Sequence, residues 1–317
     1  MTTPFDRAEW YQLLIDSGLV PLIAMASDQD ASAALALTEA GGRITALRNW
    51  YSFTWRPLAP AGPHGDALLI AIARQLKARG HRVTLEPVPG EDGSATRLAA
   101  AFGAAGWLVE VSPCDTNHIL HVKGRSFADY WASRPGPLRT TFKRKGKKVT
   151  CRIVTAFDPA LWAEYERIYA ASWKPAEGDP ALLRAFACAE SASGRMRLGL
   201  AYHEGTAIAA QFWTVENGIA YIHKLAHLES HKALSAGTSL SAALFEHVID
   251  TDRVSLIDFG TGDQSYKADW MEETRARYCI DCLNPVRLRA LPPLAKRMLR
   301  QIAPGMAGKL APGRTHG

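Results

Sequence analysis

The sequence is poor in cysteine and contains no long apolar run. Its five cysteines are odd in number and scattered, and Cys279 and Cys282 form a lone CxxC pair inside an alternating strand pattern. Without a second pair we expect neither a zinc site nor a redox dithiol. No run of about 18 apolar residues could span a bilayer, and the first residues lack a signal-peptide pattern. These absences predict a reducing, cytoplasmic location.

Acidic residues are absent from the C-terminal end of the chain. None follows Asp281, although seven basic residues do: Arg287, Arg289, Lys296, Arg297, Arg300, Lys309 and Arg314. Leu294, Met298 and Leu299 can share one helical face, so residues 286–317 are expected to form a basic amphipathic tail suited to a membrane surface. A packed terminal helix with a charged outer face is the alternative. The net charge of +6 favours an anionic partner, either CoA phosphates, nucleic acid or acidic lipid headgroups.

The remaining composition is that of a globular protein with room for two packed modules. The chain has 317 residues, of which 47% are hydrophobic and 21% charged. Helix and strand patterns alternate over residues 4–122, with a hairpin expected around Gly41 and Gly42, and a similar layout returns in the second half. The fold class predicted from this alternation is α/β.

Residues 221–270 form the stretch that is richest in functional signals. They read as a strand (221–226), a turn of small residues, a helix (239–250) and a second strand (254–259). A helix start has backbone N–H groups without internal partners, so it suits a phosphate. An ordinary helix N-cap is the simpler interpretation. The residues expected to bind the phosphate are Ser235, Ala236, Gly237, Thr238 and Ser239.

A dense polar cluster follows the second strand. It reads Asp258-Phe259-Gly260-Thr261-Gly262-Asp263-Gln264-Ser265-Tyr266-Lys267-Ala268-Asp269-Trp270. Open α/β sheets bind their ligands beyond the carboxyl ends of strands, which is where this cluster lies. We therefore expect it to belong to a binding or catalytic site.

These motifs resemble those of GNAT-like acyltransferases of the CelD and FemAB-related group. The matching segments are Tyr221-Ile222-His223-Lys224, the turn Ser235-Ala236-Gly237 and the cluster from Asp258 to Trp270. Two features depart from the family pattern. Ala236 stands where the family has proline, and the common Arg/Gln-x-x-Gly-x-Gly/Ala loop is absent. The close resemblance covers residues 195–282.

The resemblance implies two GNAT-like lobes, each a mixed, mostly antiparallel sheet flanked by helices. The expected boundaries are residues 1–135 for the first lobe and 136–285 for the acyltransferase lobe. It also implies an N-acyltransferase that takes an acyl group from acyl-CoA, or from an acyl carrier protein, and passes it to an amine. No metal is expected, because His223, His227 and His231 do not lie on a continuous helical pattern.

The same resemblance supplies candidate catalytic roles. His223 or Asp263 is expected to act as the base and Tyr266 as the acid that protonates the departing thiolate. Lys267 is expected to hold phosphate or to stabilise developing charge. Asp258 is expected to orient the cluster, although bracing the loop is an alternative role for Asp258 and for Trp270.

Three features bear on the acceptor. They are the aromatic stretch 49–55, the basic segment 139–148 and the tail. An apolar groove beside a cationic surface suits a lipid amine at an anionic membrane, so a long-chain sphingoid base, as in bacterial ceramide synthases, is the leading expectation. Dense aromatics also occur in ordinary cores, and a basic segment can be a solvated helix face.

Other acceptors and donors stay open. Cell-envelope amino sugars, polysaccharide precursors and small amines are alternative acceptors, and aminoacyl-tRNA is the alternative donor among FemAB relatives. Few aromatic residues interleave the basic segment and no long helical arm is visible, so nucleic acid is not the favoured partner. A binding module without catalytic activity is the third possibility.

Overall fold

The computed structural model describes residues 3–293, which divide into two compact units. Each unit is assembled from separated stretches of chain. Unit 1 contains residues 3–19, 48–55 and 114–277, and unit 2 contains residues 20–47, 56–113 and 278–293. The aromatic stretch 49–55 thus belongs to the same unit as the polar cluster at 258–270. The expected lobe boundaries after residues 135 and 285 stay a prediction, and most of the expected tail lies outside the described residues.

Unit 2 is a sheet covered by helices. Its own strands are β1 (Leu22–Ser27), β2 (Ser32–Ala40), β3 (Arg43–Ala46) and β4 (Arg82–Pro89), and its helices are α2 (Pro63–Arg79) and α3 (Ser94–Ala104). The expected hairpin is confirmed, because β2 pairs antiparallel with β3 across Gly41 and Gly42, which both have positive φ. Strands β5 (Leu108–His121) and β11 (Glu273–Leu283) each contribute residues to both units. The sequence pattern predicts two separate strands at residues 106–112 and 117–122, whereas β5 is a single strand.

Unit 1 carries the elements that position the site. Its strands are β6 (Thr150–Val154), β7 (Met196–His203), β8 (Thr206–Glu216), β9 (Ile219–His227) and β10 (Leu256–Thr261). Its helices are α1 (Ala8–Asp16), α4 (Phe127–Ala132), α5 (Gly136–Lys145), α6 (Pro159–Ala170), α7 (Pro180–Ala192) and α8 (Ala236–Glu246). The strand order from β5 is β5-β10-β9-β8-β7-β6.

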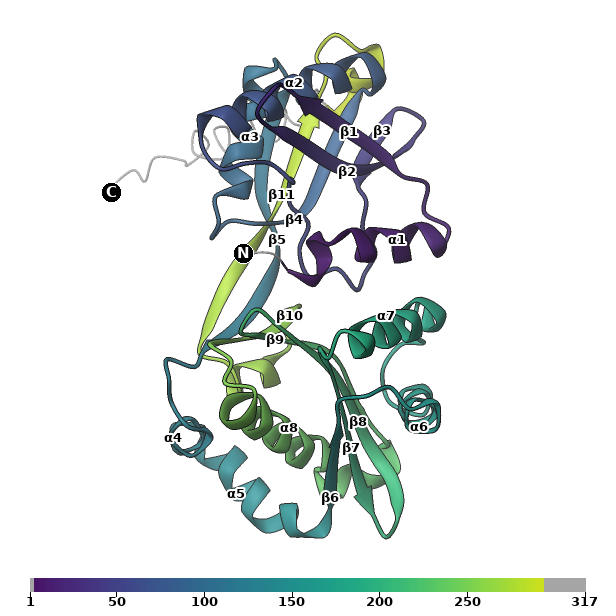
Figure 1. The fold of residues 1–317 in the computed structure, drawn as a ribbon, viewed down its shortest axis with the longest axis vertical. Helices are drawn as coiled ribbons and strands as arrows, with labels where there is room; N and C mark the ends of the chain where they lie inside the picture. Colours follow the sequence, from purple (N-terminus) through teal and green to yellow (C-terminus); the bar gives the residue numbers. More distant parts are fainter. Residues whose placement is uncertain (1–2, 294–317) are drawn as a thin grey trace, which may run out of the picture. The chain divides into compact units, whose positions relative to one another are not determined.

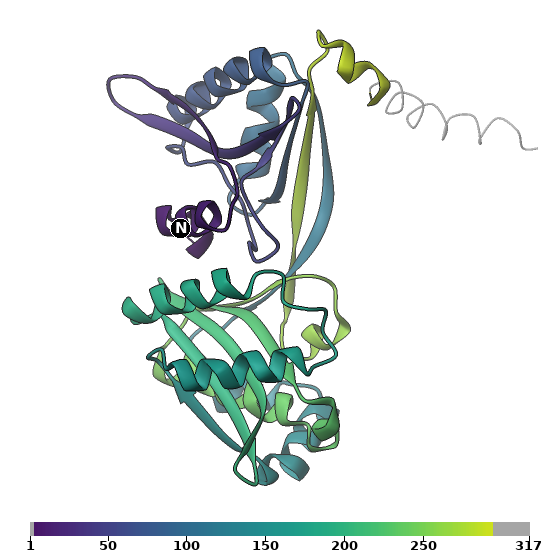
Figure 2. The ribbon, with the colours of Figure 1, turned by 90° about the vertical axis from the view of Figure 1, so that its right-hand side faces the viewer.

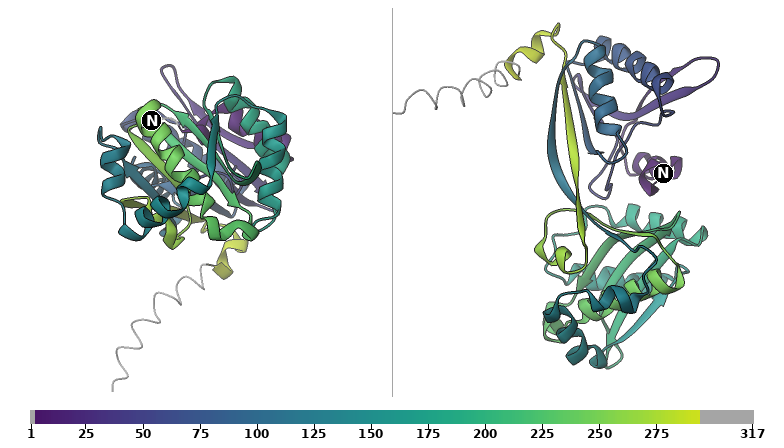
Figure 3. Two further views of the ribbon diagram at one scale, coloured as in Figure 1. Left: turned by 90° about the horizontal axis from the view of Figure 1, so that it is seen from below. Right: turned by 90° about the vertical axis from the view of Figure 1, so that its left-hand side faces the viewer.

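Helices cover both faces of the unit 1 sheet. Helices α6 and α7 lie on one face, while α8, with α5 beside it, lies on the other (Figures 1, 2 and 3). Helix α8 packs closely because β7 presents Gly199, where an added Cβ would meet Leu244 at 2.8 Å and Leu240 at 3.0 Å. The sheet and α8 therefore fix each other's position.

Strands β9 and β10 separate soon after they begin. They pair in parallel only over Ile219–Tyr221 and Leu256–Asp258. On its other edge β9 has a bulge, since Phe212 opposes Lys224 while Trp213 opposes Ile222, which leaves His223 as the extra residue. A second irregularity follows Asp258 in β10. Beyond residues 221 and 258 the two strands are thus free to admit another molecule between them.

An aromatic cluster holds α8 against the sheet. The Phe245 ring is fully buried, stacks on Tyr130 at 5.3 Å and contacts Trp270 at 4.9 Å and Trp213 at 5.3 Å. Trp270 ends the polar cluster, so this packing ties the end of that segment to α8. The bracing role that the sequence left open for Trp270 is therefore present.

We predict that Phe245→Ala will lower the free energy of unfolding by about 3–5 kcal/mol, the usual cost of removing a buried phenyl ring. Phe245→Leu, which refills much of the cavity, is expected to cost less than half as much. Urea denaturation followed by tryptophan fluorescence measures both. Equal losses in the two variants would contradict the assignment of this ring as a packing anchor.

Candidate functional site

The start of α8 borders a pocket of about 290 Å³, which we call the helix-start pocket. Its lining includes four of the expected phosphate-binding residues, Ser235, Ala236, Gly237 and Thr238, while Ser239 is buried behind them. Leu225 comes from β9 and Phe259 from β10, so the pocket lies where the two strands separate. Tyr266 and Trp270 from the polar cluster complete this side.

The helix start is open to an anion. Ser235 adopts the left-handed conformation with φ 51° and its side chain does not cap the helix, and the Ser239 hydroxyl is buried without a hydrogen-bond partner. Lys145, from the basic segment, donates a hydrogen bond from Nζ to Ser235 Oγ at 3.0 Å. Thr238 and Ser239 donate their N–H groups to Ser235 O at 3.0 and 3.2 Å. The first N–H groups of α8, beside the Lys145 ammonium, form an electropositive site that suits a phosphate. The simpler interpretation, a side-chain N-cap at Ser235, is not what the structure contains.

On the other side of the separated strands lies a cavity of about 410 Å³, which we call the aromatic pocket. It shares Trp173, Leu225, Phe259 and Tyr266 with the helix-start pocket. Aromatic side chains dominate its lining: Trp10, Trp50, Tyr51, Phe53, Tyr169, Trp173, Phe186, Phe259 and Tyr266. The two pockets therefore adjoin the same pair of strands and the same tyrosine.

The stretch 49–55 divides between core and pocket. Tyr51, Phe53 and Trp55 are buried, whereas Trp50 is 57% exposed. Phe53 lies over Gly260, where an added Cβ would meet its ring at 2.8 Å, so no larger residue fits at that position. Trp55 belongs to the core, whereas Trp50, Tyr51 and Phe53 line the aromatic pocket.

A buried ion pair lies at one end of the aromatic pocket. Lys224 is 7% exposed, and its Nζ donates to Glu177 Oε1 at 2.7 Å. The Tyr51 hydroxyl donates to the same oxygen at 2.7 Å, and the rings of Trp50, Tyr51 and Tyr169 surround the ammonium at 4.4–5.2 Å. Burial lowers the pKa of Lys224, while Glu177 opposes that shift.

His223 lines the aromatic pocket but is a poor base. Its ring is packed among Phe53, Phe186 and Phe212, and Nε2 lies 2.8 Å from Thr214 Oγ1. Burial lowers the pKa of His223 to about 3, with Lys224 and Arg7 adding to the shift. The imidazole is therefore neutral at physiological pH and accepts a proton weakly.

Asp258 is held in a buried hydrogen-bond network. Its Oδ1 accepts from Asn117 Nδ2 at 2.6 Å and from the Gly260 N–H at 2.8 Å. Asn117 Nδ2 also donates to Gly260 O, and Arg277 Nη2 donates to Asn117 Oδ1 at 2.7 Å. Burial raises the pKa of Asp258 and Arg277 opposes that effect. The contacts favour a role for Asp258 in bracing the irregular end of β10.

The remaining cluster residues differ in their access to the pockets. Asp263 has a side chain that is 86% exposed, lies 3.6 Å from His118 Nε2 and lines neither pocket. Tyr266 lines both pockets, and burial raises its pKa to about 12. Lys267 lines the aromatic pocket, donates from Nζ to Thr261 O at 2.5 Å and has its pKa lowered to about 8 by burial, against the attraction of nearby aspartates.

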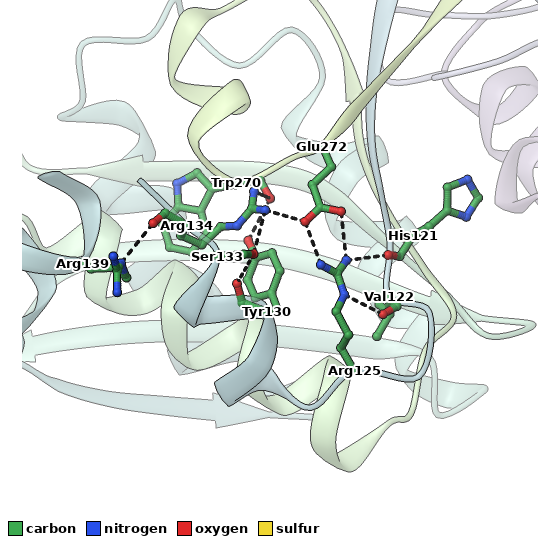
Figure 4. Close-up of polar contacts among 9 residues, drawn as sticks. All are labelled: His121, Val122, Arg125, Tyr130, Ser133, Arg134, Arg139, Trp270 and Glu272. Carbon is green, nitrogen blue, oxygen red and sulfur yellow. Dashed lines mark hydrogen bonds and ion pairs between the residues drawn. The ribbon is translucent and has the colours of Figure 1, made fainter. Parts of the chain in front are cut away.

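A polar network fixes the segment that carries Tyr266 and Trp270 (Figure 4). Tyr130 OH donates to Trp270 O at 2.8 Å, and Arg134 donates to the same carbonyl at 3.3 Å. Arg125 and Arg134 both bind the Glu272 carboxylate. Arg125 Nε also donates to Val122 O, and the Arg134 guanidinium lies over the Tyr130 ring at 4.7 Å. The network anchors the chain directly after Trp270 to α4 and its flanking turns.

Sequence reasoning missed several residues of the aromatic pocket. Trp173, Lys174 and Pro175 lie in the loop between α6 and α7, and Gln264 lies within the recognised cluster. Glu177, from the same loop, pairs with Lys224 at the edge of the pocket. The run Trp173-Lys174-Pro175 in a loop is the signal that could have drawn attention to it, since an aromatic and a cation together outside regular structure are typical of binding sites.

Two absences apply to the described part of the chain. Within residues 3–293, no group of three or more histidine, cysteine, aspartate or glutamate side chains is placed to hold a metal ion. In the same range no helix has the length and apolar character needed to cross a membrane.

Comparison with known proteins identifies a domain that includes β9 and β10, the two strands that adjoin both pockets. Residues 138–268 match the family model described as acetyltransferase (GNAT) domain. The expected α/β fold class is thereby confirmed, and the matched domain supports the expected N-acyltransferase activity. Such a domain implies an acyl-CoA-type co-substrate and an amine acceptor in general terms. A search of curated protein sequences found no match.

Several solved structures share the fold at low identity. FemX matches with a TM-score of 0.64 and 11% identity, covering 89% of this chain and 92% of its own. The C-terminal domain (DUF2156) of a protein assigned as lysylphosphatidylglycerol synthetase from Agrobacterium fabrum matches with a TM-score of 0.59 and 12% identity, covering 91% of each chain. L-PGS from Bacillus licheniformis gives 0.59 and 12%, covering 92% and 96%. These likenesses concern the fold alone.

We predict that Lys145→Gln will raise the KM for acyl-CoA about tenfold, the equivalent of roughly 1.4 kcal/mol for one charge-assisted contact with phosphate. Steady-state kinetics with varied acyl-CoA measures this. Lys123→Gln is the matched control, because Lys123 is exposed and lines neither pocket. An unchanged KM in Lys145→Gln would remove Lys145 from the carrier site.

We predict that Tyr266→Phe will lower kcat by roughly 10²-fold, the usual contribution of a positioned acid. Because a pKa of about 12 keeps the phenol protonated, the loss should be the same at every pH from about 6 to 9. A pH–rate profile of both forms measures this. A loss confined to the alkaline end would mean that Tyr266 acts through its phenolate instead.

Proposed function

We propose that the protein transfers an acyl group from acyl-CoA, entering through the helix-start pocket, to an amine bound in the aromatic pocket. The separation of β9 from β10 after Tyr221 and Asp258 is the observation that carries this proposal. A thioester arm can lie between the strands only where their pairing has ended, and both pockets adjoin that opening. The phosphates of the carrier would then meet the start of α8 and Lys145.

The reaction needs the amine nitrogen, the thioester carbonyl carbon and the Tyr266 hydroxyl to be brought together. The neutral amine nitrogen attacks the thioester carbonyl carbon, the C–N bond forms and the C–S bond breaks. The amine loses a proton to water, the departing thiolate takes a proton from Tyr266 OH to leave as a free thiol, and the Tyr266 phenolate then regains a proton from water. Tyr266 suits this role because its side chain lines both the donor and the acceptor pocket.

The other expected catalytic residues receive different roles in this proposal. Lys267, beside Tyr266 in the aromatic pocket, stabilises the negative charge that develops on the thioester oxygen or sulfur. Asp258 braces β10. His223 and Asp263 are poorly suited as bases, because one has a pKa of about 3 and the other lines neither pocket. The amine proton is therefore transferred to water in the open pocket.

The acceptor that the sequence favoured, a long-chain sphingoid base, stays a hypothesis within this function. An apolar groove of about 580 Å³ between α6 and α7 shares Tyr169, Lys174 and Leu183 with the aromatic pocket and could take an aliphatic chain. Most of the expected basic tail, which would support a lipid acceptor at a membrane, lies outside the described residues. Cell-envelope amino sugars fit the polar end of the aromatic pocket.

Aminoacyl transfer from tRNA is the second candidate. The fold shared with FemX and the exposed basic residues Arg139, Lys143 and Arg144 on α5 favour it. Such a donor would place its phosphates along α5 as well as at the start of α8. Its binding would weaken steeply with salt, because many phosphate contacts release counterions.

We predict release of free thiol when acyl-CoAs of increasing chain length are incubated with the protein and a panel of amines, including sphinganine and glucosamine. A thiol-reactive dye measures the rate, and heat-inactivated protein is the control. Salt-dependent tRNA binding without thiol release from any acyl-CoA would transfer the assignment to the aminoacyl reaction. A preference for palmitoyl-CoA with sphinganine would support the lipid acceptor.

A further inference from the structure

The charged side chains that line the aromatic pocket are all of one sign. They are Lys174, Lys224 and Lys267, and no aspartate or glutamate belongs to the lining. A site for a purely cationic amine would be expected to present carboxylates or aromatic faces without ammonium groups, because like charges repel in a low-dielectric pocket. The lining therefore indicates a ligand that carries negative charge.

Two of the three lysines are already engaged by the protein. Lys224 is paired with the Glu177 carboxylate and enclosed by aromatic rings. Lys267 donates to the Thr261 carbonyl and feels the attraction of Asp115, Asp258 and Asp263. The charges of Lys224 and Lys267 are thus at least partly balanced before any ligand binds.

Lys174 differs from these two. Within residues 3–293 its ammonium forms no ion pair. Its Nζ lies over the face of Trp173, 5.8 Å from the ring centroid. Burial lowers its pKa to about 8, and the nearby charges of Lys224 and Lys267 add to that shift while Glu177 opposes it. A partly buried ammonium without a counter-ion is unfavourable, and a bound anion would relieve this cost. Lys174 also lines the groove between α6 and α7, so it lies where the two cavities meet.

We propose that the acceptor carries an anionic group, a carboxylate or a phosphate, in addition to its reacting amine, and that this group binds Lys174 in the aromatic pocket. The inference rests on the proposed function, since it assigns the acceptor to that pocket. The aromatic lining then holds the apolar part of the acceptor, and the anion fixes its orientation so that the amine faces Tyr266. Amino acids and phosphorylated or acidic amino sugars have this chemistry, whereas a long-chain base does not.

Binding can be tested without turnover, using probes that differ only in charge. N-acetyl-L-phenylalanine and its amide form the carboxylate pair, and phenyl phosphate and phenol form the phosphate pair. Trp50 and Trp173 line the pocket, so quenching of tryptophan fluorescence reports occupancy. We expect the anionic member of at least one pair to bind about tenfold more tightly than its neutral partner.

Variants at Lys174 then test whether Lys174 causes the preference for the anionic probe. In Lys174→Gln the two probes of a pair should bind with about equal affinity. Lys174→Arg should retain the preference for the anionic probe, because a guanidinium keeps the charge. Lys123→Gln is the charge-matched control and should leave the preference unchanged. No preference in either pair, or a preference that survives in Lys174→Gln, overturns the proposal whatever the enzyme's activity.

The turnover assay distinguishes a failure of this inference from a failure of the proposed acyl-transfer function. Thiol release that is equally fast with phenylalanine and phenylalaninamide would leave acyl transfer standing and contradict an anionic acceptor. Succinyl-CoA and butyryl-CoA are compared in the same assay. If Lys174→Gln abolishes a preference for succinyl-CoA, the anion belongs to the acyl group and the assignment to the acceptor is overturned.

Discussion

The separation of β9 from β10 is the constraint on which the rest of unit 1 depends. Two parallel strands that stop pairing leave backbone N–H and C=O groups without ladder partners, so the gap must be occupied by side chains, water or a ligand. The bulge at His223 and the irregular end of β10 turn both strands away from each other. Asn117, Arg277 and the Asp258 carboxylate hold the β10 side in that shape.

Each side of this opening is built from a different part of the chain. The centre of the helix-start pocket is the turn and the start of α8, which follow β9 in the local order of strand, turn and helix. Lys145, which lies 90 residues before Ser235, contacts this turn. The aromatic pocket takes residues from α1, the stretch 49–55 and the loop after α6, which are distant in sequence. The centre of the donor site is thus locally encoded, whereas the acceptor pocket depends on how the whole unit folds. Because Trp173 lines both pockets, a change at Trp173 in the loop after α6 affects the donor side as well.

This difference explains what the sequence could and could not predict. The strand-turn-helix-strand unit, the phosphate-suited turn and the position of Tyr266 follow from periodicity, small residues and a contiguous motif. The pairing of Lys224 with Glu177 joins residues 47 positions apart, which no local pattern encodes. His223 illustrates the limit, because its motif suggested a base while its aromatic surroundings, invisible in sequence, depress its pKa to about 3.

The buried lysines show how one pocket can bind charge and still perform acyl transfer. An amine nucleophile must be neutral to attack, and a cationic pocket favours the neutral form of a bound amine by lowering its pKa. Lys174 therefore acts in two ways on a bound acceptor: it attracts the anion and disfavours protonation of the amine. Lys224 contributes less, because Glu177 pairs with it and balances part of its charge. A carboxylate in place of Lys174 would do the opposite, holding the amine as an unreactive ammonium.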